Sequence, residues 1–308
     1  MPTKRGSIHL FRFGGINVYL HWSWFLLALY GIQTRAGEYS SYVWPVLEYL
    51  SLFVIVMLHE FGHSLACKQV GGHADTIVLW PFGGVAYVSP PPRPGATLWC
   101  IAAGPLVNVA LFPMLTVLML LSNWHGWPAS MPDAYHFIVA IWQLDLLLLI
   151  FNLLPIYPLD GGQILQSLLW FLFGRARSLM IAASLGLAGV AVLIVLAVAS
   201  RSWWLGILCG LVVMYCWGGL QRARALSRLA AAPRQPGLAC PACKDAPPIG
   251  PFWRCGKCGN GYDVFAQQGV CPNCGAQAAA VPCLSCGTVN SLQAFQLAAG
   301  DKMPRPYL

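Results

Sequence analysis

Two histidines and a glutamate interrupt an otherwise apolar stretch of the chain, Val54 to Ala66, with the sequence VIVMLHEFGHSLA. His59 and His63 are four residues apart, which in a helix places both imidazoles on one face with Glu60 beside them. This HExxH spacing is typical of a zinc site whose glutamate serves as general base. Because each ionisable group in a membrane helix costs about 2 kcal/mol or more, a compensating cation is expected. We therefore predict zinc here, rather than two histidines hydrogen-bonded at a helix interface.

A catalytic zinc usually has three protein ligands and a water, so the motif needs one more donor. The chain has no glutamate after Glu60 and lacks the extended metzincin pattern, which leaves aspartates, other histidines or cysteines. Asp160 is the strongest candidate because Pro155 and Pro158 break the helix before it, and a Gly-Gly pair after it allows close backbone approach. The alternative is that Asp160 only caps the following helix.

The composition is that of a polytopic membrane protein and excludes a soluble enzyme. Of 308 residues, 57% are hydrophobic and only 9% are charged, and the mean hydropathy is +0.62. We predict about six transmembrane helices, the first acting as an uncleaved signal, with a further half-buried helix as an alternative at 164–173. The predicted spans are 18–32, 42–66, 96–121, 137–154, 181–199 and 203–220.

Lys and Arg are distributed unequally between the two sides that these spans define. One side receives only Arg35 and Arg201, and the other receives Lys4, Arg5, Arg12, Lys68, Arg93, Arg175, Arg177, Arg222, Arg224 and Arg228. The positive-inside rule then predicts a multi-pass protein of the cell (inner) membrane with both termini cytosolic. Basic residues beside the lipid bilayer also explain the net charge of +8, so no nucleic-acid partner is expected.

The segment Thr76 to Val88, TIVLWPFGGVAYV, has β-branched and aromatic residues on both sides of Phe82, Gly83 and Gly84. This pattern predicts a short membrane-associated β-hairpin or re-entrant loop, with a simple turn as the alternative. Non-helical backbone at that depth must be buried in protein or line a cavity. It could therefore offer an open strand edge beside the metal, which makes these three central residues candidates for substrate binding.

Taken together, HEFGH and NLLPIYPLDGG resemble the site-2 protease family of intramembrane zinc metalloproteases. The resemblance extends over about residues 8–220 and includes GINVYLHWSW, GHADTIVLWPFGG and AAGPLVN. It is strongest to the branch without a PDZ insertion that is related to the sporulation-factor protease. Members of that branch often carry a C-terminal CBS domain, whereas this chain has cysteine knuckles at that position.

The resemblance implies that His59, His63 and Asp160 bind zinc and that Glu60 is the general base. It also implies that Asn152 and Pro158 shape the site, Asn152 by contacting the oxyanion or substrate or else by satisfying backbone groups at the helix break.

Two further polar residues of the apolar spans receive structural predictions. We assign Asn108 to helix packing. Asp145 would lie roughly 20 Å from Asp160 on a continuous helix, too far to ligate the same ion, so we expect a polar pair with an unidentified partner.

Eight of the twelve cysteines form four CxxC pairs after residue 239, separated by 11, 12 and 8 residues. Such knuckles bind zinc in a reduced compartment, and no βαβ pattern supports a redox role. We predict two zinc ribbons built from Cys240, Cys243, Cys255, Cys258, Cys271, Cys274, Cys283 and Cys286. The predicted domains are a strand-like lead-in at 1–17, a six-span domain at 18–232 and a cytosolic double zinc-ribbon domain at 233–308.

The function predicted from these features is intramembrane zinc proteolysis of a single-span membrane protein, with one catalytic and two structural zinc ions. The ribbons are expected to contact a cytosolic protein or to gate the active site. A catalytically silent zinc-dependent receptor or scaffold is the alternative, although retention of Glu60 argues against it. A membrane hydrolase of non-peptide substrates is a third hypothesis.

Overall fold

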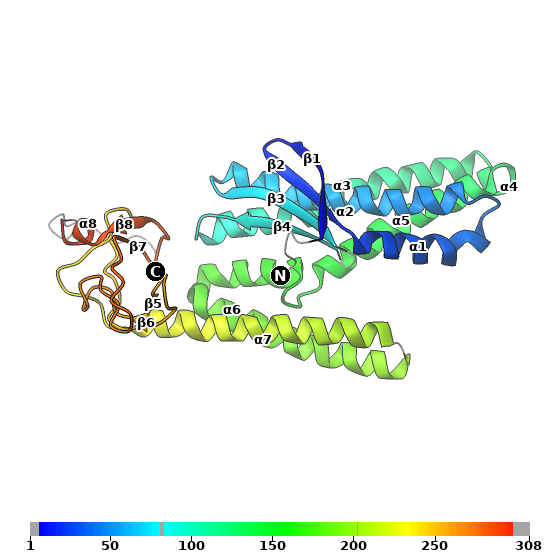
Figure 1. Ribbon diagram of the computed structural model, residues 1–308. Coiled ribbons are helices and arrows are strands. Elements are labelled where there is room, and N and C mark those ends of the chain that lie inside the picture. Colours follow the sequence, from blue (N-terminus) through cyan, green and yellow to red (C-terminus); the bar gives the residue numbers. More distant parts are fainter. Residues whose placement is uncertain (1–5, 81–82, 202, 298–308) are drawn as a thin grey trace. The chain divides into compact units, whose positions relative to one another are not determined.

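A computed structural model describes residues 6–80, 83–201 and 203–297 of the chain (Figure 1). The chain divides into two compact units, Met1–Leu220 and Gln221–Leu308, and each is described by itself. The domain bounds predicted from the sequence, 18–232 and 233–308, stay a prediction.

The first unit contains a four-stranded sheet. Its strands are β1 (Ser7–Phe13), β2 (Ile16–His21), β3 (His73–Trp80) and β4 (Gly83–Ser89), in the order β1-β2-β3-β4. The β2–β3 pair is parallel and the outer pairs are antiparallel, so the predicted hairpin at 76–88 is confirmed. Alternate apolar residues of β2 and β3 pack on α2, which leaves β4 as an edge strand beside that helix.

The first predicted span, 18–32, starts too early, because its first residues form a strand. Residues up to His21 belong to β2, and the helix α1 (Ser23–Arg35) is only 13 residues long. Ile16 and Val18 are fully buried on one face of the strand, and they alternate with the partly exposed Asn17 and Tyr19 on the other face.

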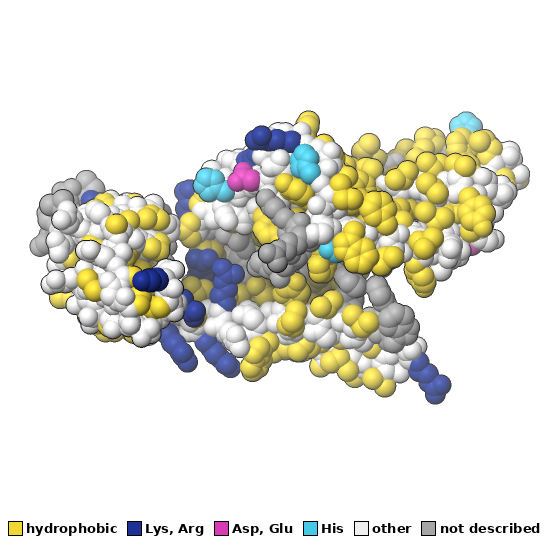
Figure 2. Space-filling model, in the orientation of Figure 1, with side chains coloured by type: hydrophobic (Ala, Val, Ile, Leu, Met, Phe, Trp, Pro, Cys, Tyr) yellow, Lys and Arg dark blue, Asp and Glu magenta, His cyan; other side chains and the backbone are white. Residues whose placement is uncertain are grey.

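Four described helices are long and apolar enough to cross a membrane: α2 (Val43–Gln69), α3 (Pro94–Trp124), α5 (Pro132–Leu153) and α6 (Asp160–Ala199). The 3-10 turn η1 (Ala36–Glu38) follows α1, the short α4 (Trp127–Ser130) joins α3 to α5, and α7 (Trp203–Ala231) follows α6. A mostly helical, multi-span architecture is therefore confirmed, whereas the count of six spans stays a prediction. Figure 2 shows hydrophobic side chains covering much of this unit's helical surface, as expected of surfaces that face lipid.

Helix α6 is interrupted at Gly174, whose φ of 77° and ψ of 166° are not helical. The element is thus two helices, one before and one after this glycine, in agreement with the predicted extra helix at 164–173. The second helix packs with α7 through Val190, Val212 and Cys216 against Ile156, in the segment that precedes α6. This packing holds the residues before Asp160 in place.

Within the described part of the second unit, two small antiparallel ribbons are followed by a short helix. The first ribbon pairs β5 (Trp253–Arg254) with β6 (Gly261–Tyr262), and the second pairs β7 (Ala280–Pro282) with β8 (Val289–Ser291), before α8 (Leu292–Leu297). Its core combines buried cysteines with Trp253, Tyr262 and Phe295. So small an apolar core is typical of domains that depend on metal sites or disulfides.

Candidate metal centre

The structure brings together His59 and His63 of α2 and Asp160, the first residue of α6. The two Nε2 atoms are 3.1 Å apart, and they lie 3.0 and 3.3 Å from Oδ2 of Asp160. Both histidines are buried, with 4% and 6% of their surface exposed. Zinc held at about 2.1 Å by tetrahedral nitrogen and oxygen ligands would separate them by roughly 3.4 Å, so the three donors fit one ion.

The hydrogen bonds on the far side of each imidazole support the same conclusion. Nδ1 of His59 is 2.6 Å from Oδ1 of Asn108, and Nδ1 of His63 is 2.9 Å from the carbonyl oxygen of Cys100. Because a carbonyl oxygen can only accept, each Nδ1 carries the proton and each Nε2 presents a lone pair. Two lone pairs and a carboxylate oxygen then face one point inside an apolar domain, an arrangement that repels itself unless a cation binds there.

Glu60 lies beside this cluster and is tied to the edge strand. The residue is 7% exposed, and its Oε2 accepts a hydrogen bond of 2.9 Å from the backbone N–H of Ala86 in β4. A Cβ added to Gly84 would lie 2.2 Å from Cγ of Glu60, so strand and carboxylate can approach only because that residue is glycine. The free edge of β4 therefore runs directly past the glutamate.

The break between α5 and α6 positions Asp160. A Cβ on Gly161 would lie 2.3 Å from the carbonyl oxygen of Leu153, and one on Gly162 would lie 2.4 Å from the backbone nitrogen of Tyr157. The glycine pair thus permits the tight approach that the sequence suggested, and Asp160 opens the helix that follows. The chain here also contains the cis Tyr157–Pro158 bond.

The remaining candidates for the site stay predictions. Asn152 lies half-buried in the last turn of α5, and Pro158 lies in the break that follows. Gly83 begins β4 next to the Gly84 position described above, whereas Phe82 lies outside the described residues.

Sequence reasoning missed three residues at this centre. Asn108 was assigned to packing, but it contacts His59 directly, and its Nδ2 donates a 2.7 Å hydrogen bond to Oδ1 of Asp145, which supplies the partner that the sequence left unidentified. Gly104 of α3 leaves the space that the imidazoles need, because a Cβ there would lie 2.2 Å from Nε2 of His63. A polar residue inside an apolar span is the only sequence signal that marks Asn108 and Asp145.

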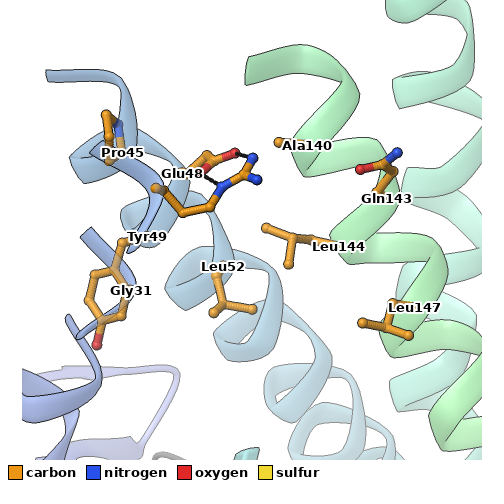
Figure 3. Close-up of a pocket in the computed structure, with 10 residues that line it drawn as sticks. Gly31, Pro45, Glu48, Tyr49, Leu52, Ala140, Gln143, Leu144 and Leu147 are labelled. Atoms are coloured by element: carbon orange, nitrogen blue, oxygen red, sulfur yellow. Dashed lines mark hydrogen bonds and ion pairs between the residues drawn. The ribbon is translucent and has the colours of Figure 1, made fainter. Parts of the chain in front are cut away.

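A separate polar cluster lies further along α2, toward its N-terminus. Arg35 donates from Nε and Nη2 to Glu48 at 3.0 and 2.6 Å, and the hydroxyl of Tyr39 donates to the same carboxylate at 2.8 Å. These side chains border a cavity of about 370 Å³ between α1, α2 and α5, and Figure 3 shows Glu48 among the residues that line it. Eleven residues of helix, or roughly 16 Å, separate Glu48 from His59, so this cluster is distinct from the metal centre.

The eight cysteines of the second unit gather into two groups of four. Cys240, Cys243, Cys283 and Cys286 form one, and Cys255, Cys258, Cys271 and Cys274 form the other. Sulfur atoms across the CxxC pairs lie 3.7 Å apart in the first group and 3.6 Å apart in the second. Four sulfurs at about 2.3 Å from a tetrahedral zinc would be separated by roughly 3.8 Å, so both groups fit a structural zinc ion.

The two thiol groups are nested along the chain, since the second group lies wholly between the two halves of the first. Hydrogen bonding also favours the ligand form of the exposed Cys258. The backbone N–H of Asn260 and then the side chain of Asn273 lower the pKa of this thiol to about 6, and zinc binds the thiolate.

Comparison with known proteins gives a consistent set of relatives. The family model described as Peptidase family M50 matches residues 48–141 and 127–196. Zinc metalloprotease MJ0392 of Methanocaldococcus jannaschii is 37% identical over 182 residues, which are 58% of this chain and 50% of that protein. Putative zinc metalloprotease Rip3 of Mycobacterium tuberculosis is 30% identical over 211 residues, 63% of this chain and 52% of that protein.

Similarity also extends to solved structures. The site-2 protease from Methanocaldococcus jannaschii is 30% identical in sequence, with 70% of this chain and 95% of that chain covered and a TM-score of 0.49. The chain spans about half the length of the curated relatives named above.

Proposed function

We propose that the chain is an intramembrane zinc metalloprotease of Peptidase family M50, the family whose model it matches. It would cleave a peptide bond in or near a transmembrane segment of a membrane-protein substrate. The observation that carries the proposal is the convergence of two imidazoles and one carboxylate within 4.8 Å of one another, directly beside Glu60. A receptor or scaffold would need the ligands but not this glutamate.

The roles of the residues follow from their positions. We assign His59, His63 and Asp160 as zinc ligands, and the bound metal would polarise a peptide carbonyl and lower the pKa of a water. Glu60 adjoins the ligands without belonging to the group of converging donors, so it can take the proton of that water and return it to the leaving amine. Its burial keeps bulk water away from both proton transfers.

The edge of β4 is the proposed binding surface for the substrate. A transmembrane helix must unwind before its amides can be attacked, which loses backbone hydrogen bonds that an edge strand can replace. Since the N–H of Ala86 points at Glu60 rather than at β3, an extended segment paired along this edge would pass the base. Gly83 and Gly84 would let that segment lie close, and Asn152 and Pro158 would shape the opposite wall.

The second unit is proposed to bind two structural zinc ions through its nested thiol groups. Its role would be to contact a cytosolic protein or to control access to the protease. A cytosolic partner requires the second unit to lie in the cytosol, so we also propose an inner-membrane location with both termini cytosolic.

The test compares membrane proteomes of cells that express the wild-type chain or Glu60→Gln. A single-span membrane protein should accumulate uncleaved in the variant, because the base is lost while the ligands remain. Glu48→Gln is the matched control, since it changes the other buried glutamate of α2 without touching the metal centre. Identical substrate patterns in wild type and Glu60→Gln would contradict proteolysis by this site.

A further inference from the structure

A continuous hydrogen-bonded chain leads away from the metal centre through three helices. It starts at Nδ1 of His59 on α2, passes through the amide of Asn108 on α3, and ends at the carboxylate of Asp145 on α5. The two distances are 2.6 and 2.7 Å, and both Asn108 and Asp145 have no exposed surface. No zinc ligand other than His59 takes part in this chain.

The carboxylate fixes which way the amide faces. The amide of Asn108 presents its NH2 group to Oδ1 of Asp145 and its oxygen to Nδ1 of His59, and the accepting oxygen of Asp145 holds it in this orientation. The amide oxygen in turn requires a proton on Nδ1 of His59, which leaves the lone pair on Nε2. With the amide turned over, its NH2 group would meet Nδ1, and the imidazole proton would move to Nε2, where it would point at His63 and Asp160 and block ligation.

His63 is held in a different way. Its Nδ1 bonds to the backbone carbonyl of Cys100, an acceptor that cannot turn over or be removed by a side-chain substitution. One ligand is thus oriented by the backbone, and the other depends on two side chains. Burying an acidic side chain in an apolar helix costs free energy. Among the described residues, the second carboxyl oxygen of Asp145 has no hydrogen-bond partner that would offset this cost.

We propose that Asn108 and Asp145 are positioning residues that hold His59 in its metal-binding tautomer, so that Asp145 controls zinc affinity without touching the ion. This inference rests on the zinc site of the proposed function. Partners behind a ligating histidine typically change metal affinity by about 10- to 100-fold when they are lost. The same range is expected here.

The experiment uses isosteric substitutions in the full-length, detergent-solubilised chain. In Asp145→Asn, the neighbouring amide loses the partner that fixes its orientation. The double variant Asn108→Asp with Asp145→Asn reverses the polarity of the pair, because the carboxylate at position 108 can accept from both His59 and the amide at position 145. The atoms and the volume are almost unchanged throughout.

Zinc retained per chain is measured after dialysis against increasing concentrations of a chelator, and His59→Ala gives the background from the cysteine sites. The membrane-site zinc of Asp145→Asn should be lost at 10- to 100-fold lower chelator than in wild type. The double variant should return to within about threefold of wild type. Thr116→Val is the matched control, because it removes a hydrogen bond of 2.9 Å from Trp142 between the same two helices and should leave zinc retention unchanged.

The possible results distinguish the positioning role of Asp145 from the existence of the zinc site. Equal zinc retention in wild type and Asp145→Asn, or a double variant no better than the single one, would overturn the positioning role while the zinc site stands. Loss of zinc in Thr116→Val to the same extent would also overturn it, because any damage between α3 and α5 would then suffice. A wild-type chain that retains no more zinc than His59→Ala would overturn the proposed site itself.

Discussion

Nε2 of His59 and Oδ2 of Asp160 lie 3.0 Å apart, although 101 residues separate the two in the chain. One belongs to the middle of a long helix and the other to the first residue of a helix that starts after a proline-rich break. The centre therefore depends on the position of that break as much as on the HExxH motif, and substitutions on the two sides should have separable effects.

Asp160→Ala should remove the membrane-site zinc, because two imidazoles alone rarely hold the ion against competing chelators. Glu60→Gln should keep that zinc and lower cleavage by about 100-fold or more, since only the base is lost. Zinc content and turnover of a reconstituted substrate measure the two effects. Full membrane-site metal in purified Asp160→Ala would identify another residue as the third ligand.

Gly104→Ala should abolish zinc binding although it adds only one methyl group. The added carbon would lie 2.2 Å from Nε2 of His63 and 2.8 Å from Nε2 of His59, which forces the imidazoles out of their positions. Gly218→Ala is the control, because a Cβ there meets nothing within 4 Å. Zinc analysis of both proteins decides the point, and normal metal content in Gly104→Ala would mean that the helices separate at little cost.

The proposed orientation predicts which loops an impermeant thiol reagent can reach in intact cells. A cysteine placed at the exposed Ser130, the last residue of α4, should react, and one placed at the exposed Arg177 of α6 should not. The wild-type chain gives the background, since its cysteine-rich tail should be protected inside the cell. The reverse labelling pattern would place the metal centre near the opposite face of the membrane.

Purified, fully reduced protein should contain three zinc ions per chain, one for each group of converging ligands. Cys258→Ser should lower the count to two, because a closed tetrahedral site needs all four thiolates to compete for the metal. Cys209→Ser, a buried cysteine outside those groups, should leave three. A count that does not fall in Cys258→Ser would rule out a four-thiolate zinc site at the second group.

Arg35→Gln should destabilise the chain by about 1–3 kcal/mol, because it leaves the carboxylate of Glu48 buried with one hydrogen-bond donor, Tyr39. The double variant with Glu48→Gln should recover part of this loss, since no unpaired charge then remains. Thermal unfolding in detergent measures both. An Arg35→Gln protein as stable as wild type would mean that water reaches Glu48.

The parts of the site that are formed by residues close together in the chain could be predicted from the sequence. The four-residue spacing of His59 and His63 already fixes their common helix face, and prolines followed by a Gly-Gly pair mark the break at Asp160. The hairpin was also predictable, because glycines sit between two β-branched runs.

The contacts between residues of different helices could not be predicted, because they depend on how each helix is rotated about its axis. Asn108 and Asp145 are each a single polar residue within a nearly uniform apolar span, so neither has a periodic pattern that indicates its facing direction. Only packing of α3 against α5 and α2 aligns them behind His59. By contrast, the strand at 16–21 alternates Ile16, Val18 and Leu20 with Asn17, Tyr19 and His21, so its period of two can be read from the sequence.

The nested order of the two thiol groups predicts the order in which they would bind zinc during synthesis. Cys258 and Cys271 are 13 residues apart, whereas Cys243 and Cys283 are 40 residues apart, so closing the outer loop alone costs about 1 kcal/mol more in chain entropy. The inner four ligands also leave the ribosome before the outer four are complete. A zinc ion bound by the inner group would therefore be captured first and would shorten the loop that the outer group must close, so the newly made tail would mature from its centre outward.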